Sequence, residues 1–341
     1  MSATSSYGQH NPSAPSDVRA EFRALISECG VYELSSRAKI RLTGSDCVRW
    51  LNGMVTNNIR DLAPDHGVYA FLLNPQGHIQ ADIYAYHRGE SLLLDAGQSQ
   101  LKKLLEIFDH YIIMDDVEVA DVSQELASFG ITGPMSPAVL ASAGIEAPVL
   151  QPLQSADLSW NGTDLTVIRS DNPLLDSYEL WLAPSQAGPL RQALVKAGAS
   201  PVGSNALELL RIASGIPLLG TDIRERDLPQ ETEQARALNF HKGCYIGQEI
   251  VERIRSRGAV HRKFTGFLID GPLPRPGVTI QADDKNIGEI TSVASLPLAN
   301  GERKFALGYL RREAATPGKE FQAGGSKVIV TNLPFVEALE Q

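Results

Sequence analysis

Residues 242–249, which read Lys-Gly-Cys-Tyr-Ile-Gly-Gln-Glu, combine the residue types of a reactive thiol site. Gly243 and Gly247 lie on either side of Cys244, and two glycines so close together allow a tight loop whose backbone can approach a ligand. We therefore expect the thiol to lie in a small loop. Tyr245 beside it would either stack on a flat ligand or pack against the protein.

A helix is predicted directly after this loop. Ile246, Ile250 and Ile254 recur at helical spacing, and the helix would begin near Gln248. The N-terminal end of a helix favours anions, and Lys242 adds a positive charge nearby, so both would raise the thiolate fraction of a neighbouring cysteine. The pattern predicts a reactive thiol, although a small, buried and unreactive cysteine is a common alternative.

The elements around this loop indicate an α+β fold. Residues 68–73 and 78–86 are predicted to form two strands of a hairpin, joined by the turn Asn-Pro-Gln-Gly at 74–77. Strands and helices alternate irregularly along the chain, which favours α+β over a doubly wound sheet. From Lys263 onward, five or six short strands separated by Gly, Pro, Asp and Asn predict a small separate β-barrel.

These patterns divide the chain into three parts. Residues 1–16 are rich in Ser, Pro, Gly and Asn, which predicts a disordered tail. The α+β core is expected over residues 17–262, with uncertain internal boundaries, and the barrel over residues 263–341.

Composition excludes several classes of protein. The chain is 43% hydrophobic and 21% charged, as in ordinary globular proteins, and its net charge of −9 argues against direct binding of duplex nucleic acid. Cys29, Cys47 and Cys244 lie far apart, so neither a disulfide framework nor a structural metal site is expected. No apolar run approaches the ~20 residues of a membrane helix. We expect a cytoplasmic protein that does not bind membranes.

The octapeptide 242–249 matches the K-G-C-Y-x-G-Q-E signature of the YgfZ family, which comprises folate-binding relatives of the glycine-cleavage T-protein, an aminomethyltransferase. Residues 228–231 resemble the L-P-x-E segment of that family, and residues 253–263 resemble its R-x-x-x-R-G…R-K stretch. Residues 40–46 and 210–217 are similar to segments of the wider T-protein superfamily. The resemblance covers nearly the whole chain, and it is most specific around Cys244.

The resemblance implies a T-protein-like, folate-binding core of two interwoven α+β subdomains with a C-terminal β-barrel. It also implies tetrahydrofolate or a derivative as cofactor, and support of iron–sulfur cluster assembly or repair in client enzymes, including tRNA-modifying ones. Cys244 would be a nucleophile, a redox thiol or a transient cluster ligand, Lys242 would activate it and hold a ligand anion, and Tyr245 would assist. The residues expected to contact the cofactor are Asp82, Arg211, Gly243, Gly247, Gln248, Glu249 and Arg253.

Two departures from the transferase pattern argue against aminomethyl transfer. Ala213 stands where the transferase has Glu, and Ala81 stands where it has the first acid of an Asp-Asp pair. Asp82, the remaining acid, would polarise the pterin or simply cap a turn. The alternatives to a folate-binding iron–sulfur protein are a folate-dependent aminomethyltransferase or demethylase, and a non-catalytic adaptor.

A basic stretch follows the octapeptide. One interpretation is a solvated helix face, on which Glu249 and Glu252 pair with arginines. The other is a site for an anion: the glutamyl tail of folate, an acidic partner or RNA phosphate. The basic stretch consists of Arg253, Arg255, Arg257, His261, Arg262 and Lys263.

Overall fold

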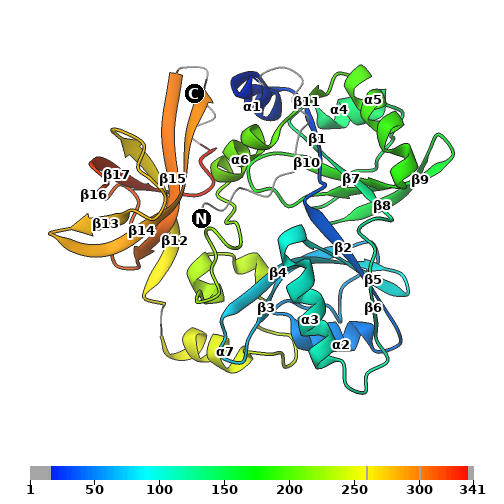
Figure 1. Cartoon of the computed structure of the whole chain (residues 1–341), viewed down its shortest axis with the longest axis horizontal. Coiled ribbons are helices and arrows are strands. Elements are labelled where there is room, and N and C mark those ends of the chain that lie inside the picture. Colours follow the sequence, from blue (N-terminus) through cyan, green and yellow to red (C-terminus); the bar gives the residue numbers. More distant parts are fainter. Residues whose placement is uncertain (1–16, 259, 299–300, 337–341) are drawn as a thin grey trace. The chain divides into compact units, whose positions relative to one another are not determined.

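The computed structural model describes residues 17–258, 260–298 and 301–336 (Figure 1). The tail predicted over residues 1–16 therefore lies outside the described residues. Within the described chain, helices and strands alternate irregularly, as the sequence predicts for an α+β protein.

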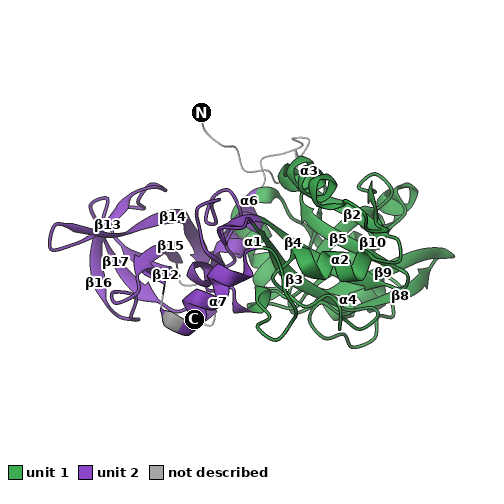
Figure 2. Cartoon of the chain, turned by 90° about the horizontal axis from the view of Figure 1, so that it is seen from below, with its two compact units in different colours: residues 1–73, 81–204, 236–246 green, residues 74–80, 205–235, 247–341 purple. Residues whose placement is uncertain are grey.

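Internal contacts divide the chain into two compact units, which Figure 2 colours separately. The chain passes between the units several times, so each unit consists of several stretches. It crosses inside the octapeptide, so Cys244 belongs to unit 1 and Gly247 to unit 2. Unit 1 comprises residues 1–73, 81–204 and 236–246, and unit 2 comprises residues 74–80, 205–235 and 247–341.

The first sheet of unit 1 has five strands and is covered on one face by two helices. Helices α2 (Cys47–Met54) and α3 (Leu101–Tyr111) bury Leu51 and Phe108 against it. Apolar side chains at alternate strand positions form this covered face, because successive residues of a strand point to opposite sides. The strands, in spatial order, are β3 (Gly67–Leu73), β4 (Ile79–Arg88), β5 (Ser91–Gly97), β2 (Arg37–Thr43) and β6 (Glu118–Asp121).

The predicted hairpin is confirmed, since β3 and β4 are neighbours joined by the turn at residues 74–77. Its tip belongs to unit 2, where it packs against helix α7 (Gln248–Arg257). Gly77 has a φ of 78°, and a Cβ atom there would lie 2.7 Å from the Cβ of Ile250. Both the positive φ and this close approach require glycine at the turn.

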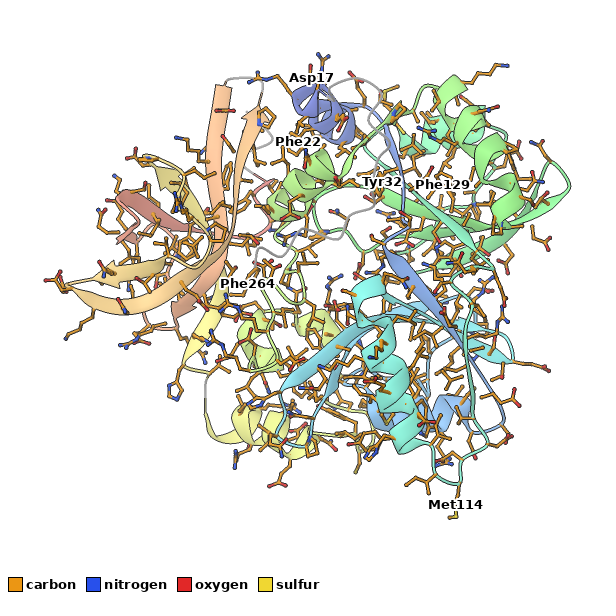
Figure 3. All side chains as sticks on the ribbon, viewed as in Figure 1. Asp17, Phe22, Tyr32, Met114, Phe129 and Phe264 are labelled. Carbon is orange, nitrogen blue, oxygen red and sulfur yellow. The ribbon has the colours of Figure 1, made fainter. Side chains whose placement is uncertain are left out.

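The second sheet of unit 1 has six strands and is covered by α4 (Ser136–Ser142) and α5 (Ala187–Lys196). Helix α1 (Val18–Ser27) precedes its first strand in the chain. Figure 3 labels Tyr32 in β1 and Phe129 in β7, which are paired antiparallel strands. The strands, in spatial order, are β11 (Ser200–Pro201), β1 (Gly30–Glu33), β7 (Ala127–Thr132), β10 (Ser177–Leu182), β9 (Thr163–Arg169) and β8 (Ser155–Trp160).

The faces of the two sheets that carry no helices pack against each other. Tyr86 and Leu93 of the first sheet contact Ile168 and Trp181 of the second in one buried cluster. The chain builds β1 of the second sheet, then all of the first sheet, and then returns to finish the second. This order is the interwoven arrangement of two α+β subdomains that was predicted.

Unit 2 contains a closed six-stranded barrel, which confirms the barrel predicted from the sequence. Its other main elements are α6 (Ser204–Ala213), most of which lies in this unit, and α7. Phe267, Ile280 and Leu310 are fully buried in the barrel core. The strands, in spatial order, are β12 (Arg262–Asp270), β15 (Gly301–Arg311), β14 (Lys285–Leu298), β13 (Thr279–Ala282), β16 (Glu320–Ala323) and β17 (Ser326–Thr331).

Candidate functional site

Lys242 is buried and holds the octapeptide loop against the end of α2. Its Nζ donates hydrogen bonds to the backbone carbonyls of Asn52, Val55 and Asn57, at 2.5, 2.6 and 2.7 Å. Carbonyls at the end of a helix lack intrahelical donors, and the ammonium group satisfies them. Burial, reinforced by Arg60, lowers the pKa of Lys242 to about 7, while the three acceptors favour its charged form. An ammonium has three N–H groups, and all three are used here, so this geometry indicates a structural role for Lys242 and argues against the expected contact with a ligand anion.

The thiol of Cys244 is exposed, whereas Cys29 and Cys47 are buried. The side chain of Tyr245 is 8% exposed, and its ring centroid lies 5.0 Å from Nζ of Lys242. Tyr245 therefore packs within the loop, which was one of its two predicted roles. Cys244 is accessible to a reagent or partner, and its reactivity stays a prediction.

Helix α7 begins at Gln248, as predicted. Gly247 is its N-cap and has a φ of 82°, a left-handed conformation that suits glycine. Glu249 lies in the first turn, where a carboxylate favours the helix dipole. Cofactor contacts stay predictions for Gly243, Gly247, Gln248, Glu249 and Arg253.

Arg211 in α6 is buried, and all five of its guanidinium N–H groups have acceptors inside unit 2. Glu208 accepts from Nε and Nη2 at 2.8 and 2.6 Å, and Asp222 accepts from Nη1 at 2.7 Å. The carbonyl of Ile216 and the hydroxyl of Ser292 accept at 2.6 and 2.9 Å. No N–H group remains for a cofactor in this geometry, which indicates a structural role for Arg211 and argues against the cofactor contact expected for it. We call these five residues, with Thr291, which bonds Asp222, the arginine network.

A second polar cluster lies on the facing sides of the two sheets in unit 1. Ala81, Ile83 and Ala85 of β4 point to the helix-covered core, so Asp82 and Tyr84 point to the opposite side, toward the other sheet. The ring centroids of Tyr84 and of Tyr69 in β3 lie 4.9 Å apart. The tyrosine cluster, as we call it, consists of Tyr69, Asp82, Tyr84, Arg37, Glu179 and Arg236.

Hydrogen bonds fix the position of Asp82 within the tyrosine cluster. One carboxylate oxygen accepts from the hydroxyl of Tyr69 at 2.8 Å, and the other accepts from the amide of Gln100 at 2.7 Å. The guanidinium of Arg236 lies 4.5 Å from the centroid of the Tyr69 ring and is paired with Asp171. The position of Asp82 is thus set by the protein itself.

The charges of the tyrosine cluster influence one another. Burial alone would lower the pKa of Arg37, but Asp95, Glu179 and Asp82 together raise it. Burial raises the pKa of Glu179, and Asp95 raises it further. Titratable groups with shifted pKa values that gather in one place are common at functional sites, although structural ion pairs also produce them.

The tyrosine cluster keeps hydrogen-bonding groups that the protein does not use. Nε of Arg37 donates to Asp95 at 2.9 Å, but Nη1 and Nη2 have no acceptor among the described residues. Oε2 of Glu179 accepts from Trp181 at 3.0 Å, and Oε1 has no donor in the part of the chain that the structure describes. Each oxygen of Asp82 can accept a further bond. The tyrosine cluster can therefore offer both donors and acceptors to a ligand.

The structure brings together only some of the predicted site residues. Asp82 alone among them belongs to the tyrosine cluster, and the other cluster residues were not predicted. A signal for one of them, Tyr84, is present in residues 80–86, Gln-Ala-Asp-Ile-Tyr-Ala-Tyr. Small apolar residues there alternate with polar and aromatic ones, which indicates a strand with one polar, aromatic face.

The described residues include no group of three or more His, Cys, Asp or Glu side chains able to hold a metal ion. Within the same residues, no helix has both the length and the apolar character needed to cross a membrane.

Two protein families match the chain. Residues 2–242 match the GCVT N-terminal domain, and residues 255–336 match the CAF17 C-terminal beta-barrel domain. Together these matches cover the α+β core and the barrel in the order expected from the sequence.

Several individual proteins are similar to this chain over most of its length. An aminomethyltransferase of Rubrobacter xylanophilus is 27% identical over 96% of this chain and 86% of its own. A putative chloroplastic transferase of Arabidopsis thaliana is 26% identical over 90% of this chain and 71% of its own. The crystal structure of the glycine cleavage system aminomethyltransferase T from Bartonella henselae superposes with a TM-score of 0.85 at 22% identity, covering 94% of this chain and 90% of that one. The predicted T-protein-like fold with a C-terminal barrel is thereby confirmed.

Proposed function

The chain belongs to the family of the GCVT N-terminal domain, and we propose that it is a tetrahydrofolate-binding protein of the YgfZ type. In this proposal it supports iron–sulfur cluster assembly or repair in client enzymes. The observation that carries the folate part is the unused hydrogen-bonding capacity of the tyrosine cluster. The exposed thiol of Cys244 in the octapeptide supports the iron–sulfur part.

The donor and acceptor set of the tyrosine cluster fits a pterin ring. A pterin is flat and presents amino and N–H donors together with a carbonyl acceptor. Asp82 and Glu179 would accept hydrogen bonds from the donors, and the free N–H groups of Arg37 would donate to the acceptor. The half-buried ring of Tyr84 adds aromatic surface, on which a flat ring can pack. Tetrahydrofolate, when bound, supplies nitrogen atoms that carry a one-carbon group.

Calorimetric titration with tetrahydrofolate tests this assignment. Asp82→Asn removes a charged acceptor, so we expect affinity to fall about tenfold or more, as for the loss of a hydrogen bond to a charged group. The matched control is Glu106→Gln, which neutralises an exposed carboxylate on α3 of the same unit. Equal affinities of the wild type and Asp82→Asn would remove the tyrosine cluster from the proposal.

The iron–sulfur part of the proposal depends on Cys244. It is the exposed one of the three cysteines, and it lies in the loop that Lys242 fastens to α2. A thiol in a fixed, accessible loop can act on a partner as a nucleophile, a redox group or a transient ligand of a cluster that passes through. The clients we propose include tRNA-modifying enzymes, and we propose a cytoplasmic location.

A strain that carries Cys244→Ala tests the role of the thiol. We expect iron–sulfur enzyme activities to fall in that strain, while the purified variant keeps its affinity for tetrahydrofolate. If the purified variant still binds tetrahydrofolate, it is folded, and the lower enzyme activities result from loss of the thiol. Normal enzyme activities in the strain would contradict the iron–sulfur role and leave folate binding to be judged by the titration.

A folate-dependent aminomethyltransferase or demethylase is the second candidate, because similar proteins carry the name aminomethyltransferase. Ala81 and Ala213 argue against it, since both side chains are fully buried where the transferase pattern has acids. Turnover of an aminomethyl or methyl donor by the purified protein with tetrahydrofolate would favour this candidate.

A further inference from the structure

Two neighbouring hollows in the surface of unit 2 form a groove along α7. Their volumes are about 360 and 320 Å³, and both are lined by Ile254 and Val260. Helix α7 and the start of β12, which follows it in the chain, are labelled in Figure 1. We call the two hollows together the α7 groove.

Positively charged side chains line both hollows. Arg255, Lys263 and Arg312 line the first, and Arg253 lines the second. Arg253 and Arg312 form no ion pair with any residue that the structure describes. Such a concentration of cations is unexpected on a chain with a net charge of −9, so it favours an anionic partner at this place.

The two carboxylates in the α7 groove do not cancel this charge. Glu231 accepts hydrogen bonds at 3.1 Å from Arg262, a cation outside the groove lining that also pairs with Asp227. Glu233 lies 3.7 Å from Lys263. The two unpaired arginines therefore remain as the charge that the α7 groove presents.

Other features of the α7 groove favour a peptide over a nucleic acid. Ile254 and Val260, which both hollows share, place an apolar surface between the cations. The described lining residues include no Phe, Tyr or Trp, the large aromatic side chains on which bases of single-stranded nucleic acids normally stack. The aromatic rings in the lining are the smaller imidazoles of His78 and His261.

We propose that the α7 groove binds an acidic peptide segment of a partner protein, with an aliphatic residue between its carboxylates. The carboxylates pair with Arg253 on one side and Arg312 on the other, and the aliphatic residue contacts Ile254 and Val260. This role for Arg253 is an alternative to the cofactor contact expected for it. It does not depend on folate binding, which concerns unit 1.

Fluorescence anisotropy with a short labelled peptide of repeated Asp-Leu-Glu units tests the proposal. We expect Arg253→Ala and Arg312→Ala each to weaken binding about threefold, and the double variant about tenfold, as for exposed ion pairs. The matched control is Arg275→Ala, an exposed arginine of unit 2 outside both hollows, which should bind as the wild type does. A peptide with Gly in place of Leu should bind more weakly, because it lacks the aliphatic contact. Unchanged thermal unfolding midpoints establish that the variants fold.

Three results would overturn the proposal. Equal binding of an Asn-Leu-Gln peptide would show that charge is not recognised. Equal affinity of the arginine variants and the wild type would place the peptide elsewhere. A single-stranded oligouridylate that binds more tightly than the acidic peptide, and loses affinity in the same variants, would make the α7 groove a nucleic-acid site.

Discussion

The arginine network of unit 2 and the tyrosine cluster of unit 1 contain similar residue types but differ in how far their hydrogen bonds are satisfied. In the network, every N–H group of Arg211 has an acceptor, and Asp222 is fully buried. In the tyrosine cluster, two nitrogens of Arg37 and one oxygen of Glu179 have no partner among the described residues. Buried polar groups are normally satisfied by the protein, whereas these unused groups lie at a partly exposed place, where water or a ligand can bond them.

This difference separates structural from functional charge. An arginine whose donors are all used inside the protein can stabilise a fold, but it has no donor left for a cofactor. Side chains that the protein holds in place through one atom, as it holds Arg37 and Glu179, keep their other atoms for a ligand. Substitution in the arginine network should therefore mainly lower stability, whereas substitution in the tyrosine cluster should mainly weaken ligand binding and change stability only slightly.

The largest effect is expected for Arg211→Met. It leaves the buried carboxylate of Asp222 without its cation, and breaking such a pair costs about 3–5 kcal/mol of unfolding free energy. Urea unfolding measures this loss, with Arg275→Met on the surface of the same unit as control. A loss below about 1 kcal/mol would contradict the structural role of the arginine network.

A smaller loss is expected for Lys242→Met. The apolar side chain leaves the carbonyls of Asn52, Val55 and Asn57 without their donor, which costs about 2–3 kcal/mol. Urea unfolding again measures the change. If stability were unchanged while tetrahydrofolate binding was lost, Lys242 would contact the ligand and the structural role would be wrong.

The smallest effect concerns the pH dependence of stability at Glu179. Its folded pKa is raised above the ordinary value of 4.5. Above pH 4.5 the folded protein therefore keeps a proton that the unfolded chain has released, and the unfolding free energy falls as the pH rises through that window. Glu179→Gln removes this titration, so its stability relative to the wild type should rise with pH, by at most about 1.4 kcal/mol per pH unit. A difference that stays constant from about pH 4 to pH 8 would show that the pKa of Glu179 is not raised.

Local patterns predicted the parts of the fold that depend on neighbouring residues. The start of α7 at Gln248, the β3–β4 hairpin and the barrel follow from glycine positions and from alternation of side chains, which the sequence displays directly. The motif likewise located Cys244, because spacing within eight residues is local information.

The partners of these residues could not be predicted, because they come from distant segments. Lys242 bonds carbonyls up to 190 residues away in the sequence, and Arg211 bonds Ser292, 81 residues away. Glu179 joins the tyrosine cluster only because two sheets pack face to face. Whether the hydrogen-bonding groups of a charged side chain have partners depends on such long-range packing. The structural role of Arg211 could therefore not be read from its neighbours in the sequence.

A crystal structure of the chain with tetrahydrofolate bound would decide whether the cofactor occupies the tyrosine cluster. We expect a pterin ring in hydrogen-bond contact with Asp82 and Glu179, with the arginine network unchanged around Arg211. A pterin ring bound away from Asp82, or one that displaces Glu208 or Asp222 from Arg211, would contradict this expectation.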